Sequence, residues 1–150
     1  MMIRFTEINR SGNEAKTTLT LCYEARTKSR LLVTLDNGVE AGLFLERGVV
    51  LKQGDILSSE QGTSVMIIAA REEVSTAHGS TQKMLHLACY HLGNRHVSLE
   101  IGDGWIRYQN DSVLDAMVRH LGLTVINEMA PFAPESGAYQ FGSHSAPTAT

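Results

Sequence analysis

The chain has 150 residues, of which 43% are hydrophobic and 19% are charged, which is the balance of an ordinary globular protein with one or two small domains. The net charge of −3 gives no electrostatic reason to expect nucleic acid. No apolar run approaches the roughly 20 residues of a membrane helix. The first residues lack the basic-then-apolar order of a secretory signal, so we expect a cytoplasmic protein without a membrane partner.

Residues 1–74 carry the pattern of a small β domain, in which short runs of β-branched and apolar residues alternate with glycine-bearing turns. Many short strands joined in this way predict a barrel or sandwich. The predicted strands are Thr18–Tyr23, Leu31–Leu35, Glu40–Leu45 and Val65–Ala70, with Ile56-Leu57 as the return of a hairpin. Arg26, Lys28 and Arg30 alternate and could share one strand face, which is either simply solvated or a surface for an anion or a protein partner.

Residues 75–140 show a different pattern, with two helical apolar stripes among short strands. Together with a strand at Glu72–Ala77, the order is β-α-β-β-α-β, which predicts a ferredoxin-like α+β domain. We expect Gly93 and Gly122 to end the helices and Ser112 to cap the second one with Asp115. The other predicted elements are a helix at Thr81–Leu92, strands at Val97–Ile101 and Trp105–Tyr108, a helix at Ser112–Leu121 and a strand at Leu123–Ile126. Residues 141–150 are predicted to be a flexible tail.

The segment from His91 to His96 lies where a helical pattern ends and a strand pattern begins, so we expect His96 at a strand start. Imidazole is the commonest protein ligand for zinc, nickel and copper, but one histidine is not a metal site. His86 and His91 diverge by roughly 140° on the helix and cannot chelate one ion. His91 is either structural or part of a site with His96, and His144 in the tail could reach the body of the protein.

Motifs of enzyme sites are missing: there is no His-Glu-x-x-His, phosphate loop or nucleophile elbow. We therefore do not expect an enzyme. Three hypotheses follow from the residues. The first is a metal-delivery protein using His96, the second a non-metal interaction adaptor in which His96 is structural, and the third a metal-dependent hydrolase. The third is weakest because no carboxylate or second histidine stands at useful spacing to His96. From the residues alone, the adaptor ranks first.

Several stretches in order over most of residues 20–140 point to one family. The most specific runs from Cys89 to His96 (Cys-Tyr-His-Leu-Gly-Asn-Arg-His), and Ala130-Pro-Phe-Ala-Pro-Glu-Ser-Gly-Ala-Tyr139 supports it independently. The others are Arg26-Thr-Lys-Ser-Arg30, Glu40-Ala-Gly-Leu-Phe-Leu-Glu-Arg-Gly48, Gly54-Asp-Ile-Leu57, Asp115 and Leu121-Gly-Leu123. In these stretches the chain resembles the UreE family of urease accessory metallochaperones.

The resemblance implies a β domain that binds partners, followed by a ferredoxin-like domain that binds metal. It implies a homodimer through the C-terminal domains, with His96 of both chains facing across the two-fold axis, and these dimers can pair into tetramers. It implies delivery of Ni²⁺ to apo-urease together with a urease GTPase accessory protein, with Zn²⁺ or Cu²⁺ as competing metals. His144 of the tail could complete the coordination of the ion.

This sequence departs from the family pattern in two places. Some members carry further metal-binding histidines in the stretch that corresponds to Tyr108–Val113, where this chain has Asn110 and Ser112. Some members also end in a histidine-rich tail, whereas this one carries the single tail residue His144. We therefore expect no peripheral sites and about one metal ion per dimer.

Overall fold

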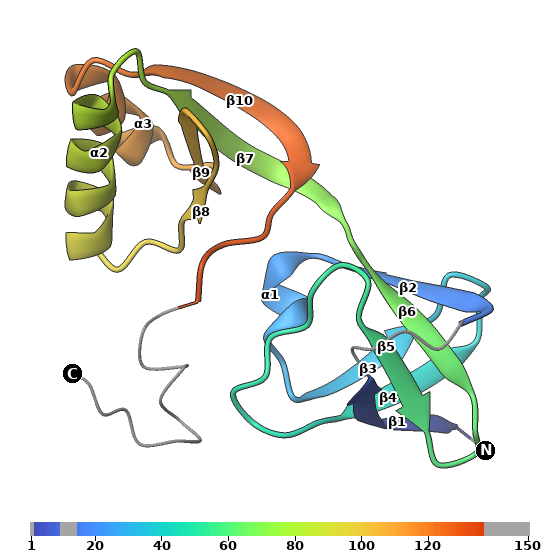
Figure 1. The fold of residues 1–150 in the computed structure, drawn as a ribbon. Coiled ribbons are helices and arrows are strands. Elements are labelled where there is room, and N and C mark those ends of the chain that lie inside the picture. Colours follow the sequence, from blue (N-terminus) through green and yellow to red (C-terminus); the bar gives the residue numbers. More distant parts are fainter. Residues whose placement is uncertain (1, 10–14, 137–150) are drawn as a thin grey trace, which may run out of the picture. The chain divides into compact units, whose positions relative to one another are not determined.

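The computed structural model describes residues 2–9 and 15–136 (Figure 1). It divides into two compact units, Met1–Ala70 and Arg71–Thr150, and each is built around a hydrophobic core of its own. The division falls at the start of a strand that begins at Arg71, which is earlier in the chain than the boundary we predicted after residue 74.

The N-terminal unit is one six-stranded sheet with the strand order β2-β6-β5-β1-β4-β3. The strands are β1 (Ile3–Asn9), β2 (Thr17–Leu21), β3 (Arg30–Thr34), β4 (Glu40–Phe44), β5 (Ile56–Ser59) and β6 (Ser64–Ala69). The predicted strands are confirmed in place, but β1 was missed. Its pairing with β5 shifts register between Phe5 and Glu7, and such a bulge breaks the alternation by which a strand is recognised.

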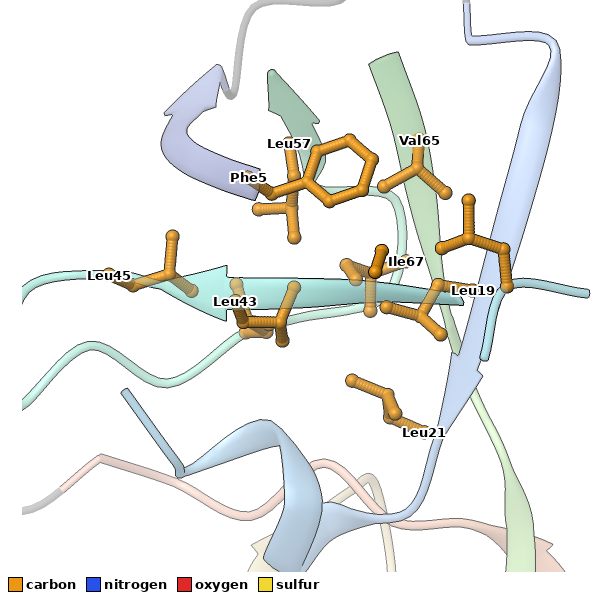
Figure 2. Close-up of a cluster of buried hydrophobic side chains, with 11 residues drawn as sticks. Phe5, Leu19, Leu21, Leu43, Leu45, Leu57, Val65 and Ile67 are labelled. Carbon is orange, nitrogen blue, oxygen red and sulfur yellow. The ribbon is translucent and has the colours of Figure 1, made fainter. Parts of the chain in front are cut away.

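The two edges of this sheet meet at one end, because the chain that follows β3 bonds to β2. The Asp36 N–H donates to the Thr18 carbonyl at 2.9 Å, and the Asp36 carboxylate accepts from the hydroxyls of Thr18 and Thr20 at 2.6 and 2.7 Å. The sheet therefore curls into a nearly closed barrel, as expected. Its interior is filled by apolar side chains from all parts of the sheet, including Phe5, Leu19, Leu43, Leu57, Val65 and Ile67 (Figure 2).

A short helix, α1 (Tyr23–Arg26), follows β2 and corrects one expectation. Arg26 is only 1% exposed, and its guanidinium donates to the carbonyls of Leu21 and Leu51 at 3.2 and 3.3 Å. Arg26 is thus a buried structural cation and does not share a strand face with Lys28 and Arg30. Cys22, at the start of α1, is exposed.

The C-terminal unit has the ferredoxin-like order β-α-β-β-α-β that the sequence predicted. Its antiparallel sheet has the order β10-β7-β9-β8, and Figure 1 shows α2 and α3 together on one side of it. The elements are β7 (Arg71–His78), α2 (Gln82–Asn94), β8 (Glu100–Ile101), β9 (Trp105–Gln109), α3 (Ser112–His120) and β10 (Thr124–Pro131).

The two helices cover one face of this sheet with the apolar stripes seen in the sequence. Ala88 and Leu92 of α2 and Leu114 and Val118 of α3 are buried against Ile106 and Tyr108 of β9. The other face of β9 carries Trp105 and Arg107, with the guanidinium carbon 4.6 Å from the centre of the Trp105 ring. The predicted alternation along β9 is confirmed.

Three local expectations in this unit were wrong. Asp111, and not Ser112, caps α3, since its carboxylate accepts from the backbone N–H groups of Val113 and Leu114 at 2.9 and 3.1 Å. The helix α2 continues through Gly93 to Asn94. The strand expected at Val97–Ile101 comprises only Glu100–Ile101. The Val97 N–H at the start of that segment bonds to the Leu92 carbonyl at the end of α2.

Candidate metal centre

His96 ends the helix α2 and does not begin a strand. Its φ is 59°, and among the described residues it is the one non-glycine residue with a positive φ. The His96 N–H donates to the Gly93 carbonyl at 3.0 Å, and the Val97 N–H donates to the Leu92 carbonyl at 3.1 Å. This pair of bonds is the Schellman motif, in which the residue after the C-cap takes the left-handed conformation. The motif places the exposed His96 at a fixed corner of the backbone.

The backbone conformation of His96 is costly for a side chain with a Cβ, and glycine usually occupies this position. Left-handed residues other than glycine are uncommon, although histidine is enriched among them, and such residues collect at functional sites. The imidazole is therefore present at an energetic cost to the fold. Gly93 stands three positions earlier, but the residue that takes the left-handed conformation is His96.

His91 lies on a partly exposed stripe of α2 that leads toward this corner. Leu87, Tyr90, His91 and Asn94 follow the spacing of one helix face, and Tyr90 is 63% exposed. The rings of Tyr90 and His91 pack edge to face with their centres 5.3 Å apart. Because His91 is half-buried and precedes His96 by more than a helical turn, it lies beside the corner rather than on it.

The other histidine of α2, His86, lies away from this corner. His86 lines a hollow of about 230 Å³ between α2 and the β8–β9 turn, together with Cys89 and Asp103. Burial raises the pKa of the Cys89 thiol, which disfavours the thiolate that binds metals. In the part of the chain that the structure describes, no three side chains of His, Cys, Asp or Glu are placed to hold a metal ion together. A site at His96 therefore needs further protein ligands from outside the described residues of this chain.

The C-terminal segment leaves the sheet close to His96. After β10, the Ala133 N–H donates to the Glu100 carboxylate at 3.0 Å, and the Glu135 N–H donates to the Leu99 carbonyl at 2.8 Å. Consecutive Cα atoms are 3.8 Å apart, so the Cα atoms of His96 and Leu99 are at most about 11 Å apart. The chain that leads to His144 thus departs beside the segment that carries His96; His144 itself lies outside the described residues.

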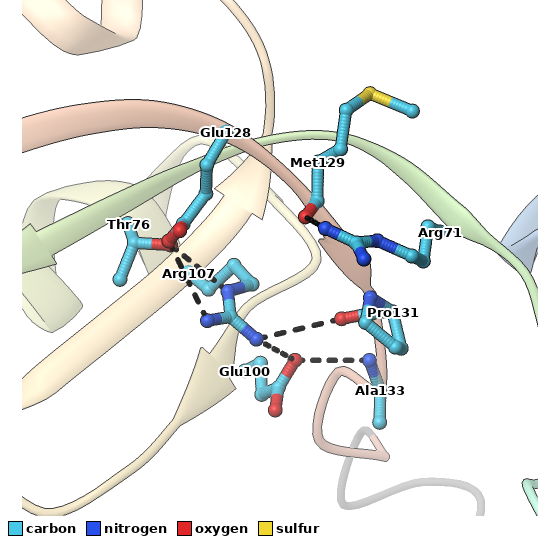
Figure 3. Close-up of polar contacts among 8 residues, drawn as sticks. All are labelled: Arg71, Thr76, Glu100, Arg107, Glu128, Met129, Pro131 and Ala133. Atoms are coloured by element: carbon cyan, nitrogen blue, oxygen red, sulfur yellow. Dashed lines mark hydrogen bonds and ion pairs between the residues drawn. The ribbon is translucent and has the colours of Figure 1, made fainter.

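Arg107 holds this exit in place (Figure 3). Its guanidinium lies 3.7 Å from carboxylate oxygens of both Glu100 and Glu128, and it donates to the Thr76 hydroxyl at 2.9 Å and the Pro131 carbonyl at 3.4 Å. This role could not be predicted from the sequence, because the partners of Arg107 are spread over three strands, β7, β8 and β10.

The stretch Tyr108–Val113, in which we expected no further metal site, includes the start of α3. Asn110 and Ser112 are exposed and flank Asp111, whose carboxylate is engaged at the start of α3. Neither Asn110 nor Ser112 offers the imidazole that a competitive nickel site requires.

The fold and the site define the class of this protein: a β-barrel unit joined to a ferredoxin-like unit, in which the exposed His96 stands in the left-handed conformation at the end of a helix. Two family models match the chain in that order. The N-terminal domain of the UreE urease accessory protein matches residues 4–70, and the C-terminal domain of the same protein matches residues 72–149.

Individual relatives support the same family assignment. The chain is 55% identical over 129 residues to the urease accessory protein UreE of Proteus mirabilis, covering 86% of this chain and 80% of that protein. It is 52% identical over 145 residues to the UreE of Vibrio parahaemolyticus, covering 92% and 91%. The chain belongs to the UreE family of urease accessory proteins. None of the helices in the described residues is long and apolar enough to span a membrane.

Proposed function

We propose that this protein is a nickel metallochaperone, which binds Ni²⁺ at a histidine site on a homodimer interface and delivers the ion to apo-urease in the cytoplasm. Membership of a urease accessory family supports the delivery role, with a urease GTPase accessory protein as the other partner. The single observation that carries the site is His96, an exposed imidazole kept at a left-handed helix end. The protein acts as a carrier and not as an enzyme.

A symmetric dimer supplies the missing ligand, because an isologous interface places the same residue of both chains across its axis. Two His96 side chains would then face one ion. The partly exposed stripe of α2 supports an interface on this side of the unit, since Leu87 and Tyr90 are apolar surface that a second copy would cover. His91, on the same stripe, would lie at the margin of the site. Such dimers could pair further into tetramers.

The tail residue His144 can complete the coordination of the ion. It stands eight positions after Ser136, and eight residues of extended chain span up to about 27 Å. That reach exceeds the separation between the exit beside Leu99 and His96. Two imidazoles, a tail ligand and water make an open site from which a carrier can release Ni²⁺, and Zn²⁺ or Cu²⁺ would compete for the same nitrogen ligands.

A calorimetric titration with Ni²⁺ tests this proposal, with the molecular mass of the protein determined by light scattering. We expect about one tight site per dimer, its loss in His96→Ala, and a partial loss of affinity in a chain truncated after Tyr139. His86→Ala is the matched control, because it removes an exposed imidazole from the same helix away from the site. Unchanged binding in His96→Ala would overturn the assignment.

The pH dependence of binding supplies an independent test. Protonated imidazole cannot ligate a metal, so the affinity for Ni²⁺ should fall steadily between about pH 8 and pH 5. Binding that does not change over this range would exclude histidine ligation. If partner binding then survived both a chelator and His96→Ala, the protein would be an adaptor in which His96 is structural.

A further inference from the structure

The outer edge of β3 is an unpaired strand edge. β3 is the last strand of the six-stranded sheet; beyond its end the Asp36 N–H bonds to the Thr18 carbonyl of β2, so the unpaired part of this edge is Arg30–Thr34. The hairpin bonds from the Leu35 N–H to the Val39 carbonyl and from the Leu45 N–H to the Ser29 carbonyl show that the odd-numbered residues of this strand bond to β4. The backbone groups of Arg30, Leu32 and Thr34 therefore point away from β4, and in the described residues no strand pairs with them.

This edge lacks the features that usually protect an edge strand. Natural edges are shielded by a bulge, a proline or a central charge, whereas β3 pairs with β4 over five residues without a register shift. The side chain at its centre is Leu32, which is 74% exposed, more than any other large hydrophobic side chain of the described residues. A regular edge that is unpaired from Arg30 to Thr34 and has an apolar residue at its centre is a template for another strand.

A shallow hollow adjoins the edge on the outer face of the sheet. It has a volume of about 160 Å³ and is lined by Met2, Leu32, Val33, Thr34, Glu40 and Ala41. Four of these lining residues are apolar, so the hollow can receive one apolar side chain from a strand that pairs with β3.

The charge around this edge is positive at one end. The guanidinium carbons of Arg4 and Arg30 lie 4.1 and 5.6 Å from the centre of the Phe44 ring. Arg4 forms an ion pair with Glu60 at 4.0 Å, and the Arg30 guanidinium donates to the Leu45 carbonyl at 2.9 Å, so the positive charge beside the start of β3 is that of Arg30. At the other end of the strand, Thr34 pairs with Glu40. A paired strand with a carboxylate opposite Arg30 is therefore favoured, and a reversed charge pattern is disfavoured.

We propose that the outer edge of β3 binds an extended acidic segment of a partner protein by strand addition. In this mode main-chain hydrogen bonds provide affinity, while side-chain pockets provide selectivity. Side chains on one face of a strand are two positions apart. The segment therefore carries an Asp or Glu, opposite Arg30, two positions from an apolar residue, opposite Leu32. This binding site lies in the N-terminal unit and does not depend on the metal site.

The test uses the full chain and two capped synthetic peptides. The first has glutamate and valine two positions apart among threonines, and the second has lysine in place of the glutamate. Titration of the isotope-labelled protein, followed by NMR, should shift the amide signals of Arg30, Leu32 and Thr34 with the glutamate peptide. Shifts centred on another part of the molecule, or no shifts at the solubility limit of the peptide, would overturn the proposal.

Variants of β3 distinguish strand addition from non-specific peptide binding. Leu32→Pro removes an N–H that does not bond to β4, so it should leave the core signals unchanged and abolish binding of both peptides. Leu32→Lys makes the same test through the side chain if the proline variant does not fold. Arg30→Glu should weaken binding of the glutamate peptide about threefold and favour the lysine peptide. Binding that is unaltered in the Leu32 variants would contradict the proposed edge.

Discussion

At His96 the backbone conformation favours glycine, whereas the proposed metal site requires an imidazole. The Schellman motif that ends α2 favours glycine at this position, and the left-handed conformation costs a residue with a Cβ about 1 to 2 kcal/mol. The positive φ of His96 persists because the adjoining Leu92 is fully buried and holds the end of the helix. A fold selected for stability alone would place glycine here.

Replacing His96 should therefore separate the two properties. His96→Gly and His96→Ala both remove the imidazole, so both should lose the tight Ni²⁺ site. The glycine variant should be more stable to urea than the alanine variant by about 1 kcal/mol, because it relieves the left-handed strain. The measurement is the urea midpoint of the metal-free proteins. Equal midpoints would mean that the backbone at His96 is not strained.

A second residue with a defined energetic role is Asp115 of α3, which is 4% exposed. Its carboxylate accepts from the Tyr108 hydroxyl at 2.7 Å and from the Asn127 amide at 3.0 Å. Burial alone would raise the pKa of Asp115, but hydrogen bonds from Asn127, Ser75 and Tyr108 and the charge of Arg119 lower it below the ordinary value. The carboxylate thus joins α3 to three strands of the sheet.

This lowered pKa predicts how stability depends on pH. A carboxyl group with a lower pKa in the folded state stabilises the fold above its unfolded pKa, near 4, and loses that contribution as the pH falls through the folded value. Asp115→Asn should therefore cost about 2 kcal/mol at pH 7, and its deficit relative to wild type should shrink below about pH 4. Urea unfolding of both proteins across this range makes the comparison. A deficit that stays constant with pH would exclude this linkage.

At the scale of elements, the Asp111 side chain stabilises the start of α3 as its N-cap. A side-chain cap contributes about 1 kcal/mol, so Asp111→Ala should lower the free energy of unfolding by that amount. Ser112→Ala, at the position that the sequence suggested as the cap, should change it by less than about 0.5 kcal/mol. Thermal unfolding of the three proteins decides between them, and a larger loss in Ser112→Ala would reverse the assignment.

The sequence predicted elements well where one face is buried, and poorly where an element ends. The stripe through Ala88 and Leu92 identified α2, because a helix that covers a sheet repeats its apolar residues at a fixed spacing. Helix ends are decided by single hydrogen bonds, and Gly93 and His96 both stood where a cap was possible. The bulge in β1 likewise removed the alternation that marks a strand. The surroundings of the candidate metal site were harder to predict from the sequence. The partners of Arg107 come from distant segments, and no ligand set is complete within the described residues.

At the scale of the whole molecule, the proposed metal site and the proposed strand-addition site lie in different units. Each has its own core, and the division at Ala70–Arg71 leaves both sheets intact. His96, the α2 stripe and the C-terminal exit all belong to the unit Arg71–Thr150, whereas the open β3 edge belongs to Met1–Ala70. Metal binding and strand addition can therefore be changed one at a time.

This division predicts that Ni²⁺ stabilises only one unit. A ligand that binds the folded form alone adds about 2.7 kcal/mol at one hundred times its Kd, so excess Ni²⁺ should raise the melting temperature of a fragment comprising residues 71–150. The fragment of residues 1–70 should melt at the same temperature with and without the ion. His96→Ala in the larger fragment is the control and should remove the shift. Stabilisation of residues 1–70 by Ni²⁺ would show that the metal site extends into the N-terminal unit.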